Sequence, residues 1–111
     1  MANTYTLIAS NTLSSSAASV TFSSIPSTYT DLVLRFSART DNGNIDDGLL
    51  LTINSTAGTA YSVTWMRGNG ATASSGRSSS TNAYSTNRMG VNGATATAST
   101  FGSGEIYIPS Y

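Results

Sequence analysis

The residue types that carry most enzyme chemistry are scarce in this chain. Its 111 residues include no histidine and no cysteine. Histidine is the commonest general base and metal ligand, and cysteine supplies thiolate nucleophiles and disulfides. The abundant serines therefore lack a partner that could activate them as nucleophiles. The composition predicts a non-catalytic protein without a cofactor.

Carboxylates are the remaining candidates for chemistry. A glycosidase needs two of them facing each other across a cleft, and the spacing of the five acids indicates no such pair. Oxygen ligands suited to a hard cation cluster in one place only, at Asp41, Asn44, Asp46 and Asp47. The cluster departs from an EF-hand, because Gly43 occupies a ligand position and no closing glutamate follows. We expect a solvated turn here, with calcium binding as the alternative.

Candidate partner contacts lie in or beside a polar stretch from residue 68 to residue 104. Guanidinium groups bind carboxylates and carbonyls of neighbouring subunits well, and tyrosine is also common in interfaces. The candidates are Arg67, Arg77, Tyr84 and Arg88. Alternatively, the arginines only keep a low-charge segment soluble. A loop this long needs either disorder or a partner that orders it.

The aromatic residues could form a platform for sugar rings, since a flat apolar face suits a pyranose. Trp65 is the only tryptophan in the chain. However, Tyr61, Val63 and Trp65 alternate with polar residues and would share the inward face of a strand. We therefore expect a core role, and glycan binding is the alternative.

Charge is low and balanced. Only 9% of the residues are charged, the net charge is zero, and every basic residue is arginine. Such a chain has no long-range field that would attract nucleic acid or an anionic membrane, and its copies repel one another little. No apolar run approaches the length of a bilayer span, and the N-terminus lacks an export signal. These features favour assembly over binding to nucleic acid or membrane.

Short segments with period-two alternation run through the chain, separated by turn residues. One chain of this length suits a single domain of residues 1–111. The alternation predicts strands over residues 4–10, 19–22, 32–39, 49–53, 61–66 and 105–108, with a weak strand near 88–91. Loops are predicted over residues 41–48 and, rich in Gly, Ser, Ala and Thr, over residues 68–104.

Strands at this spacing predict an all-β fold, specifically an antiparallel β-sandwich of the jelly-roll type. About seven short strands are few for a closed pair of sheets. We therefore expect the sandwich to be incomplete at its C-terminal end. Either a partner subunit or further strands would cover the edge left by residues 105–108.

Both ends of the chain carry patterns that resemble a known group of proteins. Residues 5–10, Tyr-Thr-Leu-Ile-Ala-Ser, are followed by residues 18–32, which run from Ala-Ser-Val-Thr-Phe through Ile-Pro-Ser to Asp-Leu. The chain ends in Glu-Ile-Tyr-Ile-Pro-Ser-Tyr. These segments resemble parts of jelly-roll-like virion structural proteins from tailed bacteriophages, many of them marine.

The resemblance implies a non-catalytic structural protein on the virion surface, made in the host cytoplasm. Its role would be capsid decoration or a head or tail fibre component. Its partners would be other virion proteins and copies of itself, so a homo-oligomer is expected. The alternative is a receptor- or carbohydrate-binding module of a tail fibre, with a host glycan as ligand.

Overall fold

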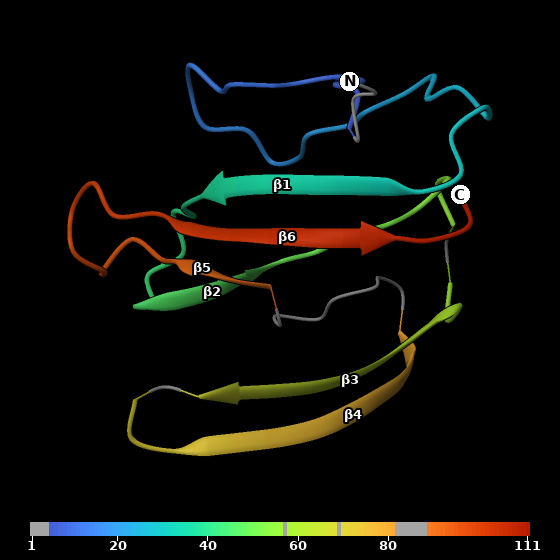
Figure 1. Cartoon of the computed structure of the whole chain (residues 1–111). Helices are drawn as coiled ribbons and strands as arrows, with labels where there is room; N and C mark the ends of the chain where they lie inside the picture. Colours follow the sequence, from blue (N-terminus) through green and yellow to red (C-terminus); the bar gives the residue numbers. More distant parts are fainter. Residues whose placement is uncertain (1–4, 57, 69, 82–88) are drawn as a thin grey trace. The chain divides into compact units, whose positions relative to one another are not determined.

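The computed structural model describes residues 5–56, 58–68, 70–81 and 89–111 (Figure 1). Six strands occur in this part of the chain and no helix, so the predicted all-β class is confirmed. The chain divides into two compact units. The terminal unit comprises residues 1–33 and 107–111, and the central unit comprises residues 34–106.

Strands β1 (Leu32–Ala38) and β6 (Gly102–Ile108) form a two-stranded antiparallel sheet. Both strands were predicted, although β6 begins three residues before the predicted start. Half-buried and exposed residues alternate along most of their length, as the period-two pattern requires. Gly104 lies against the ring of Phe36, where an added Cβ would stand 2.5 Å from the Cζ atom. The aromatic ring therefore occupies the space that a side chain on β6 would need.

Strands β2 (Asp46–Leu49) and β5 (Met89–Asn92) pair antiparallel, with Asp46 opposite Asn92 and Leu49 opposite Met89. The weak strand near 88–91 is confirmed in β5. The prediction was wrong for the neighbouring segments, because a strand starts inside the expected loop and ends at the first residue of the expected strand 49–53. Pairing with β5 decides these bounds, since four successive ladder partners outweigh the turn preference of Asp and Gly.

Strands β3 (Tyr61–Gly68) and β4 (Ala73–Thr81) form a hairpin. Strand β3 was predicted, whereas β4 lies in the region expected to be an extended loop, and that expectation was wrong. Strand β4 contains almost no apolar residue, so its alternation is invisible in the sequence. Backbone hydrogen bonds to β3 and a close side-chain fit across the hairpin hold β4 in place. Trp65 packs over its partner Gly76, where a Cβ would come within 2.6 Å of the indole ring.

The segment from residue 5 to residue 31 contains no strand, so the predicted strands at residues 4–10 and 19–22 are wrong for the described residues. The alternation of these segments does give side chains that suit a pleated sheet. A strand also needs a neighbour that accepts its backbone hydrogen bonds. No described segment supplies one here, and the chain from residue 5 to residue 24, called the N-terminal arm below, runs without regular structure.

The six strands pair as three separate two-stranded sheets. A single bridge between Arg39 and Asn92 joins the end of β1 to β5. Among the described large apolar residues only Val91 is fully buried, at 2% exposure. The antiparallel arrangement agrees with the prediction, but these sheets do not by themselves make up a sandwich.

Candidate assembly surface

Large apolar side chains are exposed along the N-terminal arm. Leu7 is 79% exposed and Tyr5 is 66% exposed. The arm also exposes Ile8, Leu13, Val20 and Phe22. Isolated exposed apolar residues are ordinary on protein surfaces, whereas several along one segment make that segment a candidate for interaction with a partner.

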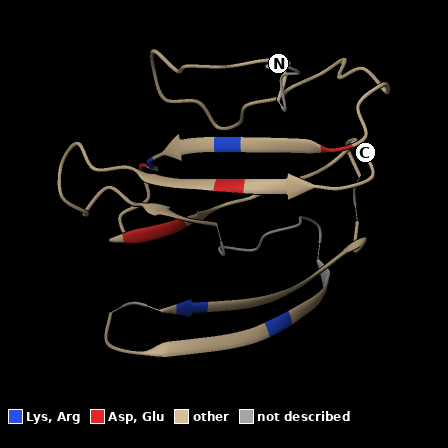
Figure 2. Cartoon of the chain, viewed as in Figure 1, with Lys and Arg blue, Asp and Glu red and all other residues tan. Residues whose placement is uncertain are grey.

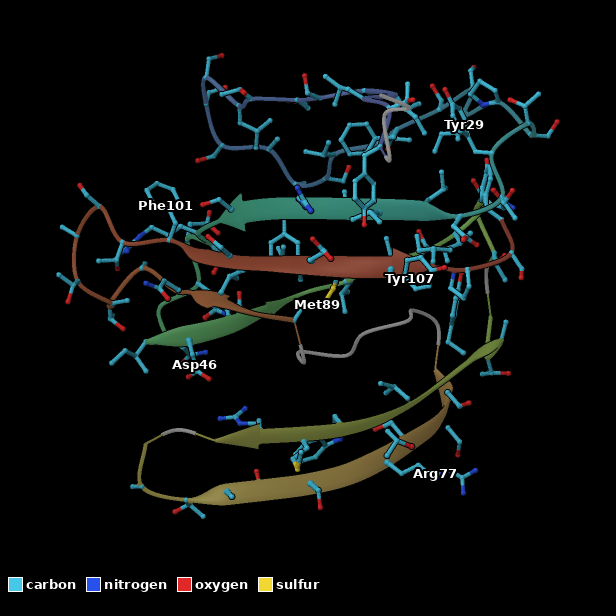
Figure 3. The ribbon with its side chains drawn as sticks, in the orientation of Figure 1. Tyr29, Asp46, Arg77, Met89, Phe101 and Tyr107 are labelled. Atoms are coloured by element: carbon cyan, nitrogen blue, oxygen red, sulfur yellow. The ribbon has the colours of Figure 1, made fainter. Side chains whose placement is uncertain are left out.

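The two ends of the terminal unit are held together by a carboxylate. Asp31 accepts hydrogen bonds from the Tyr107 hydroxyl, at 2.8 Å, and from the backbone N–H of Ser110, at 3.0 Å. The backbone N–H of Tyr111 donates to the carbonyl of Thr30 at 2.7 Å. Tyr107 itself is exposed (Figure 3). These contacts fasten the C-terminal residues beside the base of β1.

The Asp31 contacts shift both ionisable groups. The Ser110 N–H, and after it the Tyr107 hydroxyl, stabilise the ionised carboxyl and hold the pKa of Asp31 below its ordinary value. The same hydrogen bond raises the pKa of Tyr107, because only the neutral phenol can donate to the carboxylate. Both groups are exposed, so this pair is a surface contact that joins the C-terminal residues to the start of β1.

Each of the three sheets pairs only two strands among the described residues. One edge of each strand therefore lacks a described strand as its neighbour. Such an edge presents N–H and C=O groups that can pair with a strand of another chain. Each of these edges, and separately the exposed arm, is a candidate assembly surface.

The predicted partner contacts are only partly placed. Arg67, at the end of β3, forms an ion pair with Asp46 at 3.5 Å, and both side chains stay largely exposed. Arg77 lies at the middle of β4, opposite Thr64, and is exposed (Figure 3). Tyr84 and Arg88 lie outside the described residues. Arg67 and Arg77 thus lie on adjacent strands of one hairpin and are accessible to a partner.

The carboxylates of the alternative calcium loop are not all gathered on one side. Asp46 and Asp47 are successive residues of β2, and successive side chains of a strand point to opposite faces. Asp46 pairs with Arg67. The pKa of Asp47 is lowered, chiefly by the backbone N–H of Gly48, which stabilises the ionised carboxyl. In the part of the chain that the structure describes, no three acidic side chains converge as a metal site.

An arginine just after β1 organises the loop that follows β5. Arg39 donates hydrogen bonds of 2.8–3.1 Å to four backbone carbonyls, those of Ala94, Ala96, Thr97 and Thr100. The loop carries no charged residue that could have indicated this contact in the sequence. A guanidinium group suits this loop, because its five N–H donors lie in one plane and can bind several carbonyls at once.

A second arginine, on β1 itself, forms an exposed cross-strand ion pair. The Nε of Arg35 donates to the carboxylate of Glu105 at 2.7 Å, which joins β1 to β6. Figure 2 shows a basic position on β1 beside an acidic position on β6. Exposed pairs of this kind contribute about 0–1 kcal/mol. The pair aligns the two strands and contributes little to the free energy of unfolding.

Trp65 does not form an open platform for sugar. Its ring is half-buried across the hairpin against Gly76, in keeping with the expected inward position. Among the described residues, the exposed aromatic rings lie elsewhere, at Tyr5, Phe22, Phe101 and Tyr107.

Comparisons with known proteins identify no family. No protein-family model, no curated protein and no solved structure matches the chain. The described residues also contain no helix of the length and apolarity that a bilayer crossing requires.

Proposed function

We propose that this protein is a non-catalytic structural subunit of the surface of a tailed bacteriophage particle, built into a shell or fibre as many copies. The exposed apolar N-terminal arm is the observation that carries the proposal. The end patterns shared with virion proteins support the phage setting. Copies of the same chain and other virion proteins are its partners.

Burial energy favours an assembled state. Fully burying one large aliphatic or aromatic side chain contributes about 1.5–3 kcal/mol. Ordering each residue of an arm costs about 1–2 kcal/mol of conformational entropy, so an isolated chain gains little by fixing the arm. A neighbouring subunit offers both an apolar surface and a strand edge, and burial then offsets the cost of ordering.

The same arrangement completes the fold. In the assembly, an arm with period-two alternation adds a strand to a free edge of a neighbour, as in known cases of strand addition. The three small sheets then extend into the two layers of a jelly-roll-like sandwich. Low charge supports close packing of identical copies, because electrostatic repulsion between them is weak.

The oligomeric state of the full chain tests the assembly. Light scattering coupled to size-exclusion chromatography should find oligomers at micromolar concentration, and Leu7→Ser with Phe22→Ser should shift them toward the monomer. Thr6→Ser with Thr21→Ser is the matched control and should leave the oligomer unchanged. A wild-type chain that stays monomeric at every concentration would contradict the proposal.

Localisation on particles separates decoration from the glycan-binding alternative. Cryo-electron microscopy of intact phage should find many symmetric copies on the shell or along a fibre. A few copies at a fibre tip, combined with binding on a glycan array, would instead establish the receptor-binding module. Absence of the protein from purified particles would overturn both assignments.

A further inference from the structure

Three Asn-Gly dipeptides occur in the chain, at residues 42–43, 69–70 and 92–93. Glycine after asparagine leaves the backbone nitrogen unhindered, because glycine has no Cβ. That nitrogen can attack the side-chain amide carbon of the asparagine. Asn69 lies outside the described residues, so the structure distinguishes the first dipeptide from the third.

The dipeptide at residues 92–93 is held against this reaction. The backbone N–H of Gly93, the attacking group, donates to the carbonyl of Ile45 at 3.1 Å. The side-chain amide of Asn92 donates to the Thr100 hydroxyl at 2.6 Å. Both reacting groups therefore have to break a hydrogen bond, and Asn92 belongs to the β5 ladder.

The dipeptide at residues 42–43 is open. Both residues are exposed, and neither belongs to a strand. Among the described residues no hydrogen bond engages the N–H of Gly43, and nothing lies within 4 Å of the position of a Cβ there. The Asn42 side chain accepts a hydrogen bond from the side-chain amide of Asn44 at 3.0 Å, and Asn44 is itself an exposed loop residue.

From this contrast we infer that Asn42 is a site of spontaneous deamidation, whereas Asn92 is protected by the fold. The Gly43 nitrogen forms a bond to the Asn42 side-chain carbon, and the C–N bond of the amide breaks with release of ammonia. Water then opens the resulting cyclic imide, leaving aspartate or isoaspartate. No oxidant, enzyme or cofactor is needed.

The product changes a junction between two loops. The Asn42 carbonyl accepts the N–H of Ala94 at 2.7 Å, and the Asn44 carbonyl accepts that of Thr95 at 3.3 Å. In isoaspartate the main chain continues through the former side chain of residue 42. The carbonyl of residue 42 that accepts from Ala94 then becomes part of a free carboxylate. The new carboxylate at residue 42 also adds a negative charge to a segment that already carries Asp41, Asp46 and Asp47, and like charges repel. Deamidation therefore loosens the attachment of residues 93–95 to the 42–45 loop.

Peptide mapping of the aged full chain tests the inference. Trypsin cuts after arginine, so the three dipeptides fall on separate peptides, residues 40–67, 68–77 and 89–111. Deamidation at Asn42 in the native protein should exceed that at Asn92 by about tenfold or more, because one or two hydrogen bonds correspond to such a factor. In denaturant the two sites should react at similar rates, since only the fold distinguishes them.

Gly43→Ala is the matched variant. Its Cβ enters open space and its φ lies outside the left-handed region, so the fold should be unaffected while the reaction at Asn42 slows. Hydrogen exchange at the Ala94 amide should accelerate on ageing in the wild type and not in this variant. Equal native rates at Asn42 and Asn92, or unchanged exchange at Ala94 after deamidation, would overturn the inference.

Discussion

At the scale of single residues, polar side chains hold loops and chain ends where few apolar contacts exist. Arg39 gathers four carbonyls of the loop after β5, and Asp31 fastens the C-terminal residues. Each works because backbone groups of a loop need hydrogen-bond partners and lack a ladder that would supply them. Among the described large apolar residues only Val91 is fully buried, so these hydrogen bonds contribute much of what holds the loops and chain ends in place.

Replacing Arg39 with methionine should lower the free energy of unfolding by about 2–4 kcal/mol, because several carbonyls lose charge-assisted donors at once. Urea denaturation followed by circular dichroism measures the change. The matched control is Arg35→Met on β1, whose exposed ion pair should cost about 0–1 kcal/mol. Equal losses in the two variants would refute the special role of Arg39.

The Asp31 contacts should make the free energy of unfolding depend on pH in the acidic range. Because the folded pKa lies below the ordinary 3.8, the contribution is fully present above that value and is lost as the pH falls through the folded pKa. The difference in unfolding free energy between the wild type and Asp31→Asn should therefore shrink in acid. Tyr107→Phe should move the Asp31 pKa, followed by NMR, back toward the ordinary value. A difference that is constant with pH would contradict this interpretation.

At the scale of elements, the β3–β4 hairpin shows how a strand with little apolar character is ordered. Strand β4 is made mostly of serine and other small residues, and β3 contributes the large side chains of the pair. Gly76 leaves room for the Trp65 ring, so one aromatic residue covers both strands. The partner strand, rather than local preference, therefore determines the structure of β4.

Gly76→Ala should destabilise this hairpin by about 1–3 kcal/mol, since the new methyl group must displace the indole ring. Trp65 fluorescence should shift and the thermal midpoint should fall. Gly90→Ala serves as the control, because Gly90 is exposed and a Cβ added there would have no atom within 4 Å. A Gly76→Ala chain as stable as the control would show that the ring does not pack there in solution.

At the scale of the whole molecule, the proposed function predicts that folding and assembly are coupled. An arm that gains its order from a neighbour is stabilised by mass action, so the midpoint of thermal unfolding should rise with protein concentration. The Leu7 and Phe22 variants proposed above should lose this dependence. The threonine control variants should keep it.

Part of the structure could be predicted from local pattern alone. Strands β1, β3 and β6 were predicted because they alternate apolar and polar residues and one of their faces is partly buried. The weak strand β5 was also predicted, near its two apolar residues. Of the candidate site, the sequence proposed Arg67 and Arg77 as partner contacts, and both are exposed in the structure; β2 places Asp46 and Asp47, two ligands of the alternative calcium loop, on opposite faces.

By itself, the sequence determined the all-β class, the positions of the strongly alternating strands, and the absence of histidine and cysteine chemistry. Only the tertiary structure decided that β4 forms, that the N-terminal arm lies without a strand partner, and that Arg39 organises a loop. The physical reason is that alternation reports which side of a strand faces an apolar environment. It does not report which segment supplies the neighbouring backbone, and a strand exists only where such a neighbour is found.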